Sequence, residues 1–192
     1  RMSAKLALII VDMLKVFFQS GEKLPPSKNL NNVAQNIKIL LDECRRRGIP
    51  VIYSNDAFQP AEASIEPHFK LFGVHAIKGD PLSEVIDLIA PTQNDFVVEK
   101  RMYDGFYDTR LDSVLRALKV DTVIVTGTWT DGCVKHTVMG AWARCYNPIV
   151  VEDAVTSPDE NEHVWALKYM KKYYGAKVLT VSEALNMIGT TP

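Results

Sequence analysis

Six short apolar runs alternate along this chain with segments in which apolar residues recur at helical spacing. The runs cover residues 6–11, 49–53, 96–99, 120–126, 149–152 and 177–181. Runs of this length are typical of strands buried on both faces of a parallel sheet. Strands that alternate with helices imply right-handed crossovers. The sequence therefore predicts an α/β fold in which helices cover both faces of a mainly parallel sheet.

The segments between these runs predict the helices and one long loop. We expect helices over residues 30–47, 81–89, 109–118, 158–174 and 182–187, and another that begins after Cys133. In the segment 158–174, acidic residues in the first turn and lysines in the last match the helix macrodipole. Residues 59–79 have no clear period and predict a long loop with room for one short helix, a kind of segment that is often functional.

Composition narrows the classes of function. With 192 residues, 47% of them hydrophobic, the chain is expected to form one domain over residues 1–192 with a sizeable core. A net charge of −1 gives no electrostatic footprint for nucleic acid, and the apolar runs are too short to span a membrane. Three cysteines without metal-type spacing indicate a reducing compartment, so we expect a cytoplasmic location. The sequence has no glycine-rich dinucleotide motif and no P-loop.

Three chemically active side chains follow strands of the predicted sheet. Asp12 ends the first run, Lys100 follows the third, and Cys133 lies in the turn between the fourth and the next helix. The carboxyl ends of parallel strands share one edge, where ligands bind in such sheets. A helix N-terminus also lowers the pKa of a thiol, which favours a nucleophilic Cys133. Each residue also has a structural interpretation: a helix-capping aspartate, a buried ion pair between Asp12 and Lys100, and a core thiol.

An acid, an amine and a thiol at one edge can perform nucleophilic catalysis together. The carboxylate of Asp12 can take the thiol proton of Cys133, while the cation of Lys100 holds the thiolate and orients the acid. The coincidence of these residue types at three strand ends favours a catalytic site over three unrelated structural roles. A redox thiol protein is a weaker alternative, because no Cys-x-x-Cys is present.

Three motifs resemble the isochorismatase-like cysteine hydrolases, which include nicotinamidases and N-carbamoylsarcosine amidases. They are the run from Leu8 to Met13, Glu99-Lys100 followed by the segment from Tyr103 to Phe106, and the segment from Gly127 to Val134. Their order and spacing match over nearly the whole chain. The resemblance implies a three-layer αβα fold with a six-stranded parallel sheet in a Rossmann-like order. It also implies an Asp–Lys–Cys triad, which falls on Asp12, Lys100 and Cys133.

The resemblance further implies the reaction. Family members that hydrolyse isochorismate lack the cysteine, so Cys133 implies a hydrolase of a small amide or N-carbamoyl compound that forms a thioester and releases ammonia. The family has a non-proline cis peptide, matched by Thr128–Trp129, and an oxyanion hole that would use the N–H groups of Trp129 and Cys133. Members are commonly dimers or tetramers, so we expect a homodimer or homotetramer that binds a small-molecule substrate.

The chain departs from the family's metal-dependent members. Nicotinamidases bind a metal through an Asp-x-His pair and a later histidine, and here Asp56 and His75 match the first and last positions. The middle position is Phe58, which cannot bind a metal, and His68 is a further histidine of that loop. Catalytic zinc sites usually use three protein ligands. We therefore expect no metal and no other cofactor. A nicotinamidase with an altered metal site and a non-catalytic binding protein remain the alternative functions.

Aromatic side chains near these motifs are the predicted walls of a substrate pocket. They are Phe17, Phe18, Phe58, Tyr103, Phe106 and Trp129. Most aromatic residues in any chain belong to the core, so only some are expected to line the site. Asp131 and Lys135 could contact a polar substrate, and Arg101 is a possible anion clamp. His136 lies one helical turn beyond Cys133 and is expected to be structural.

Overall fold

The computed structural model describes residues 3–19 and 21–191, so residues 1, 2, 20 and 192 of the predicted domain lie outside the described residues. The strands are β1 (Leu6–Val11), β2 (Val51–Asp56), β3 (Phe96–Lys100), β4 (Thr122–Thr128), β5 (Asn147–Thr156) and β6 (Lys177–Leu179). The α-helices are α1 (Leu30–Arg46), α2 (Phe69–Phe72), α3 (Leu111–Ala117), α4 (Lys135–Ala143), α5 (Glu160–Tyr173) and α6 (Val181–Thr190). Shorter helical turns are η1 (Lys15–Phe18), η2 (Pro60–Ser64), η3 (Pro81–Ser83), η4 (Asp87–Ile89) and η5 (Thr130–Val134).

The strands form one six-stranded parallel sheet in the order β3-β2-β1-β4-β5-β6. This is the doubly wound order expected from the resemblance, and it confirms the predicted fold class. Strand β1 lies at the centre, between β2 and β4. The order reverses on either side of β1, and in open α/β sheets ligands bind beyond the carboxyl ends of the strands at such a switch point.

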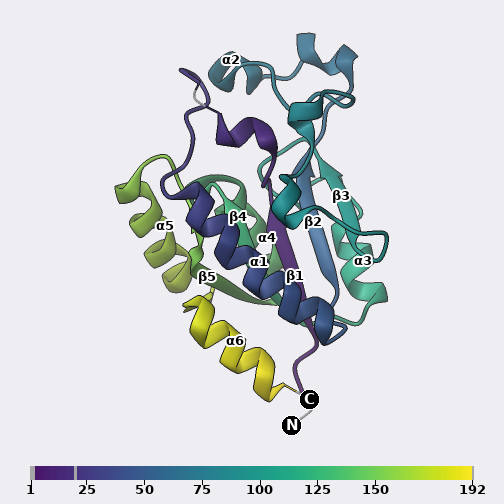
Figure 1. Cartoon of the computed structure of the whole chain (residues 1–192), viewed down its shortest axis with the longest axis vertical. Coiled ribbons are helices and arrows are strands. Elements are labelled where there is room, and N and C mark those ends of the chain that lie inside the picture. Colours follow the sequence, from purple (N-terminus) through teal and green to yellow (C-terminus); the bar gives the residue numbers. More distant parts are fainter. Residues whose placement is uncertain (1–2, 20, 192) are drawn as a thin grey trace.

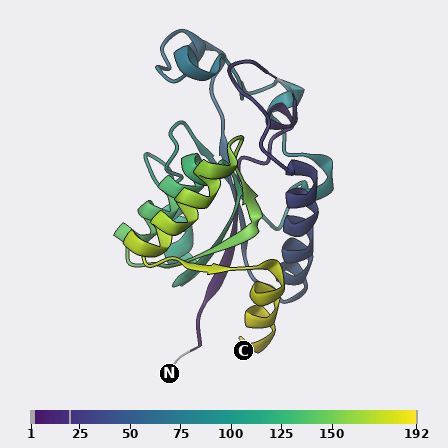
Figure 2. The ribbon, with the colours of Figure 1, turned by 90° about the vertical axis from the view of Figure 1, so that its left-hand side faces the viewer.

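Helices cover both faces of the sheet, so β1 is buried on both sides. Figures 1 and 2 show α1 and α6 on one face and α3, α4 and α5 on the other. The side chains of Leu8 and Ile10 pack in the cluster that contains α1 and α6, whereas Ile9 and Val11 pack in the cluster under the opposite helices. Successive residues of a strand face opposite sides. This explains why the first apolar run has no polar positions before Asp12.

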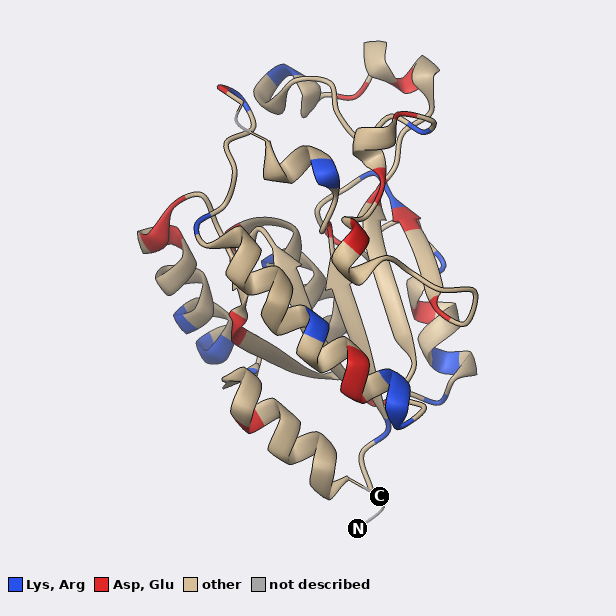
Figure 3. Cartoon of the chain, in the orientation of Figure 1, with Lys and Arg blue, Asp and Glu red and all other residues tan. Residues whose placement is uncertain are grey.

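Helix α5 shows how local sequence signals place the outer elements. The side chain of Asp159 accepts a hydrogen bond from the N–H of Glu162 and caps the helix. Its acidic residues lie in the first turn and Lys171 and Lys172 in the last, as Figure 3 shows, so the predicted match to the helix macrodipole is confirmed. Among the described residues, no helix is both long enough and apolar enough to cross a membrane.

The predicted helix over residues 81–89 is wrong. The segment instead forms the two short turns η3 and η4, separated by residues 84–86, of which Val85 pairs with Leu14 in an isolated antiparallel bridge. The N–H of Ile86 donates to the carbonyl of Met13, and the N–H of Lys15 donates to that of Glu84. These contacts with the segment after β1 satisfy backbone groups that a helix would have paired internally, so tertiary pairing overrides the local helical spacing.

Residues 57–80 rise above the carboxyl edge of the sheet together with η1. Figure 1 shows α2 at the top of the molecule, at the end opposite both termini. The expected loop over 59–79 contains η2 and α2, and Phe58 pairs with Ile77 in an isolated bridge. Strand β2 also continues past the predicted end at residue 53 to Asp56, and Lys100 is the last residue of β3. These segments therefore form a roof over the polar residues at the strand ends.

Close backbone contact between β4 and β1 generates a prediction about stability. Gly127 has a φ of 110°, and a Cβ atom at this position would overlap the backbone of Val11. We expect Gly127→Ala to lower the free energy of unfolding by at least about 3 kcal/mol, because it adds both backbone strain and overpacking. Urea unfolding measures the effect.

Gly189→Ala in α6 is the matched control, because the nearest atom to its added Cβ would be a guanidinium nitrogen of Arg47 at 3.7 Å. A helical glycine costs up to about 1 kcal/mol relative to alanine, so this variant should be as stable as the wild type or slightly more stable. Equal unfolding midpoints for Gly127→Ala and the wild type would contradict the proposed role of this close contact.

Candidate active site

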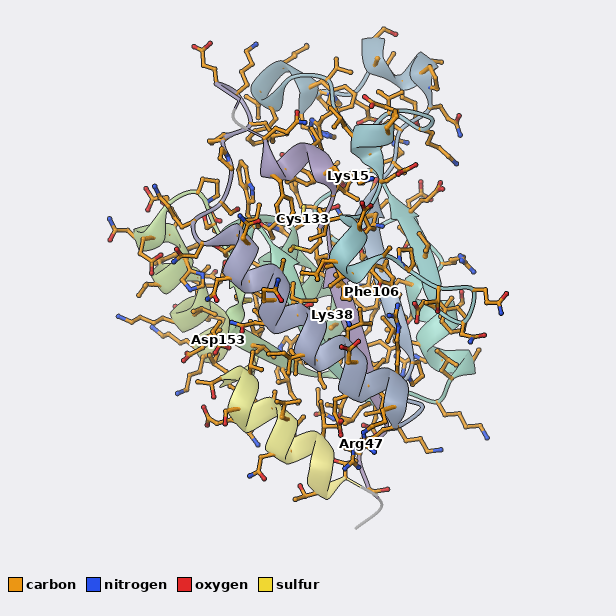
Figure 4. The ribbon with its side chains drawn as sticks, in the orientation of Figure 1. Lys15, Lys38, Arg47, Phe106, Cys133 and Asp153 are labelled. Atoms are coloured by element: carbon orange, nitrogen blue, oxygen red, sulfur yellow. The ribbon has the colours of Figure 1, made fainter. Side chains whose placement is uncertain are left out.

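The three side chains predicted at the strand ends meet around one ammonium group. Lys100 Nζ lies 2.9 Å from Asp12 Oδ2 and 3.3 Å from Cys133 Sγ. Asp12 directly follows β1, Lys100 ends β3, and Cys133 lies in η5 after β4. Figure 4 shows Cys133 at the carboxyl edge of the sheet, below η1. The order of the strands thus brings together residues that are far apart in the sequence.

Asp56 is a fourth member of this cluster, a place that was not predicted from the sequence. Its Oδ1 lies 2.5 Å from Lys100 Nζ, and its backbone N–H donates a 2.7 Å hydrogen bond to Asp12 Oδ1. Asp56 ends β2, which lies between β1 and β3. The apolar run of this strand ends at residue 53, so the pattern did not indicate that Asp56 lies at the sheet edge beside Asp12 and Lys100.

The cluster is buried and electrostatically coupled. The side chain of Lys100 is 0% exposed, and that of Asp12 is 1% exposed. Burial opposes the charged form of Lys100, but Asp12 and Asp56 outweigh it and hold the pKa of the amine well above its usual value. Lys100 is therefore a fixed cation, and its charge is shared between two carboxylates.

The two carboxylates differ in basicity. Burial, followed by the negative charge of Asp56, raises the pKa of Asp12 to about 6, against the opposing effect of Lys100. Burial also acts on Asp56, but Lys100 and His75 stabilise its charged form, so its pKa lies below the ordinary value. Asp56 is thus the permanent anion of the cluster. Asp12 is a base whose pKa lies near neutral pH, as proton transfer in catalysis requires.

The predicted lowering of the thiol pKa is wrong for this cluster. Burial raises the pKa of Cys133 well above its usual value, and the charges of Asp12 and Asp56 raise it further, although Lys100 acts in the opposite direction. One ammonium between two carboxylates does not stabilise a third negative charge on sulfur. The cluster therefore holds a neutral thiol beside a carboxylate that can accept its proton.

A cavity of about 240 Å³ opens onto this cluster. It is lined by Asp12, Phe17, Leu24, Asp56, His68, Phe72, His75, Tyr103, Thr128, Trp129, Asp131, Gly132, Cys133 and His136. Three of the predicted pocket aromatics are among these residues: Phe17, Tyr103 and Trp129. Aromatic and aliphatic walls around a few polar groups are typical of small-molecule sites.

The structure does not place the other predicted pocket aromatics, Phe18, Phe58 and Phe106, in the cavity wall. Phe58 is fully buried behind it, with its ring 4.8 Å from that of Phe69. Phe106 is also buried, and it stacks on Tyr146 in the core between the sheet and the helices. An aromatic residue near a motif can face either the site or the core, and the sequence pattern did not distinguish the two.

Several lining residues were missed or interpreted differently from the sequence. His136 was expected to be structural, but it lines the cavity, and its Nδ1 lies 2.7 Å from the carbonyl oxygen of Gly132. His68 and Phe72 come from the roof, and the ring of Phe72 contacts that of Trp129 edge to face. The irregular segment 59–79, with its two histidines, was the signal for a functional roof, although its fold could not be read from periodicity.

The two surface cations considered as substrate contacts have other partners. Arg101 Nη2 lies 2.6 Å from Oε1 of the buried Glu66, so it is not free to clamp an anion. Lys135 Nζ lies over the rings of Trp165 and Tyr169, at 5.8 and 5.1 Å from their centroids. Neither residue lines the cavity, whereas Asp131 does.

The residues at the metal position of nicotinamidases do not fit a metal ion here. In the described part of the chain, the one group of potential ligands close enough to share an ion is Asp12, Asp56 and Cys133. The ammonium of Lys100 lies within 3.3 Å of a ligand atom from each of the three, so this position already holds a cation. His75 Nε2 is 3.8 Å from Asp56 Oδ2. Lys100 thus lies at the centre of this group, and at the three positions that match the metal ligands of nicotinamidases Phe58 supplies no ligand beside Asp56 and His75.

The turn that carries Cys133 is anchored on both sides. The Thr128–Trp129 peptide bond is cis. The Thr128 hydroxyl donates to the carbonyl of Thr156 and lies 2.7 Å from the Ser27 hydroxyl. The Trp129 carbonyl accepts the N–H groups of Gly132 and Val134. These bonds fix the position of the backbone on either side of Cys133.

Comparisons with known proteins place the chain in a family. Residues 6–183 match the family model described as "Isochorismatase domain". An isochorismatase family protein of Bacillus subtilis, YaaI, is 28% identical over 180 residues, which cover 93% of this chain and 96% of that protein.

Two solved structures illustrate the range of named activities among similar folds. An N-carbamoylsarcosine amidase from Thermoplasma acidophilum is 37% identical, with a TM-score of 0.78, and the match covers 92% of this chain and 96% of that one. A pyrazinamidase/nicotinamidase from Streptococcus mutans is 30% identical, with a TM-score of 0.84, and the match covers 91% and 99% of the two chains. The similar proteins thus include amidases that act on different compounds.

The charge balance of the cluster predicts a neutral Cys133 thiol at neutral pH. In a Cys145→Ser background, which removes the exposed thiol, we expect no thiolate absorbance from Cys133 in the ultraviolet below pH 8, because burial and two carboxylates raise its pKa. The same protein with Cys133→Ser is the blank. A thiolate signal that is already complete at pH 7 would show that Lys100 dominates the cluster.

Proposed function

This chain belongs to the isochorismatase family, and we propose that it is a cysteine-dependent amidohydrolase that releases ammonia from a small amide or N-carbamoyl compound. The observation that carries the proposal is the buried ammonium of Lys100, which joins Asp12 and Cys133 beneath a cavity. A nucleophile, a base within reach and a fixed cation are the parts that acyl transfer requires. N-carbamoylsarcosine amidase among the similar structures supports the reaction class.

In the first half of the reaction, the substrate carbonyl lies above Cys133. The sulfur attacks this carbon as the thiol proton passes to the carboxylate of Asp12, and the carbonyl π electrons move to oxygen. The tetrahedral intermediate then collapses, the C–N bond breaks, and the nitrogen takes the proton from Asp12 and leaves as ammonia. A thioester on Cys133 remains. The raised pKa of Asp12, about 6, suits a group that accepts and returns a proton.

In the second half, water replaces ammonia in the site. Asp12 takes a proton from the water molecule as the water oxygen attacks the thioester carbon. The C–S bond breaks when this second intermediate collapses, and the sulfur recovers its proton from Asp12. The acid product leaves, and the neutral thiol is restored. Lys100 keeps its proton throughout, because Asp12 and Asp56 hold its pKa well above the usual value.

The N–H groups of Trp129 and Cys133 are the proposed donors to the oxyanion. Both residues line the cavity, and the hydrogen bonds to the Trp129 carbonyl fix the turn between them. Donors held in place before the reaction stabilise the developing charge without a cost of reorganisation.

Nicotinamide hydrolysis is the second candidate function within the same reaction class. The likeness to the pyrazinamidase/nicotinamidase of Streptococcus mutans favours it. The lack of a fitting metal position, with Phe58 in place of a ligand, weighs against a metal-dependent form of it. A non-catalytic binding protein would keep the fold without using the cluster, and the test below separates this reading from both enzymes.

Ammonia release from a panel of N-carbamoyl amino acids, simple primary amides and nicotinamide tests the proposal. We expect turnover of at least one class, and a loss of at least about a thousandfold in Cys133→Ala, because no other group can form the thioester. Cys145→Ala removes an exposed thiol elsewhere and should retain full activity. Unchanged turnover in Cys133→Ala, or no turnover across the panel, would count against the enzyme.

Asp56→Asn tests the part of this cluster that the sequence did not reveal. The variant keeps the backbone N–H that binds Asp12 but loses the charge that holds Lys100. Without the neighbouring anion the pKa of Asp12 falls, so we expect kcat to decrease by about a hundredfold with little change in KM.

The metal content of the purified protein supplies the control for this variant. A positioning role for Asp56 predicts no stoichiometric metal in either the wild type or Asp56→Asn, and no effect of chelators on the wild type. One equivalent of metal in the wild type that is lost in the variant would show instead that Asp56 is a metal ligand.

A further inference from the structure

The cavity over the cluster has an uneven distribution of charge. Among the described residues that line it, three are aspartates and none is a lysine or an arginine. The one nearby buried cation, Lys100, lies below the wall and is already bound to Asp12 and Asp56. Arg101 is bound to Glu66. A substrate carboxylate would therefore meet carboxylates without a free cation to balance its charge.

His68 and His75 in the wall do not supply that missing charge. Burial lowers the pKa of His68, which favours its neutral form. Burial acts in the same direction on His75, but Asp56 outweighs it, so any positive charge on His75 is matched by that carboxylate at 3.8 Å. The Nδ1 of His136 faces the carbonyl of Gly132.

Other lining residues suit a positively charged group. Trp129, Phe72 and Tyr103 present aromatic rings, and Asp131 lies two residues from Trp129 in the same turn. Asp131 Oδ1 is shielded from solvent and has no hydrogen-bond partner among the described residues. A carboxylate oxygen without a partner beside a cavity is an acceptor that the N–H groups of an ammonium ligand can satisfy. Aromatic faces beside a carboxylate are the usual surroundings of a bound ammonium group.

We propose that this cavity selects amides by charge, and that it accepts a cationic amide and rejects an anionic one, with Asp131 and Trp129 as the residues that determine this specificity. The inference rests on the proposed amidohydrolase function for the identity of the reacting group. It places the amide over Cys133 and a protonated amine against Asp131. N-carbamoyl amino acids are then excluded as substrates, because the described residues of the cavity wall include no free cation to bind their carboxylate.

Three benzamides of similar size test the proposal by direct binding. They carry an aminomethyl, an ethyl or a carboxylate group in the meta position, so they differ mainly in charge. Calorimetry with Cys133→Ala measures their affinities without turnover, and kcat/KM is then measured with the wild type. We expect the cationic amide to bind at least about tenfold more tightly than the anionic one, with the neutral amide between them. Equal or tighter binding of the carboxylate would overturn the proposal.

Asp131→Asn identifies the residue responsible. In the Cys133→Ala background, we expect it to reduce the ratio of cationic to neutral affinity by about tenfold. Asp108→Asn removes the same charge at an exposed position outside the cavity and should leave all three affinities unchanged. An unchanged ratio in Asp131→Asn would show that Asp131 does not contact the charged group.

The amidohydrolase function and the charge preference can fail independently of each other. If the neutral benzamide binds but none of the three is hydrolysed by the wild type, the amidohydrolase function fails while the charge preference is still measured. If turnover occurs and the carboxylate is the best substrate, the charge preference fails while the amidohydrolase function stands.

Discussion

The buried ammonium of Lys100 is the interaction on which the rest of the site depends. An unpaired charge in this position would be very costly, so the fold must supply anions around it. Asp12 and Asp56 do so from the ends of two neighbouring strands, at 2.9 and 2.5 Å from Nζ. The parallel sheet makes this possible, because the carboxyl ends of its central strands share one edge. The sheet order and the chemistry are thus two consequences of one arrangement.

The balance of charges in this cluster determines how the nucleophile works. Two carboxylates around one cation leave no surplus positive charge to hold a thiolate, so Cys133 is neutral until a substrate is present. The proton then has one acceptor close at hand, Asp12, whose pKa is raised to about 6 by burial and by Asp56. In the proposed reaction, the thiolate forms only as the new bond forms. This suits a buried site that opens onto a cavity.

Much of this arrangement could be predicted from the sequence, and the failures have physical causes. Asp12, Lys100 and Cys133 each follow an apolar run, so their meeting at one sheet edge was predictable. The role of Asp56 was not, because the polar residues 54–56 are buried within β2 and a hydrophobic pattern ends that strand too early. The sequence also could not show that the ring of Phe58 lies behind the cavity wall, because aromatic residues look alike in core and pocket. Only tertiary packing decides between these two positions.

The pH dependence of kcat/KM tests the account most directly. If Asp12 is the base, activity requires its carboxylate form. The value of kcat/KM must then rise with pH through an apparent pKa of about 6, because Asp12 is protonated and inactive as a base at lower pH. We predict this acidic limb in the wild type, followed by a plateau through neutral pH. A rate that instead rises only above pH 8, where an ordinary thiol ionises in water, would show that Asp12 does not take the proton of Cys133.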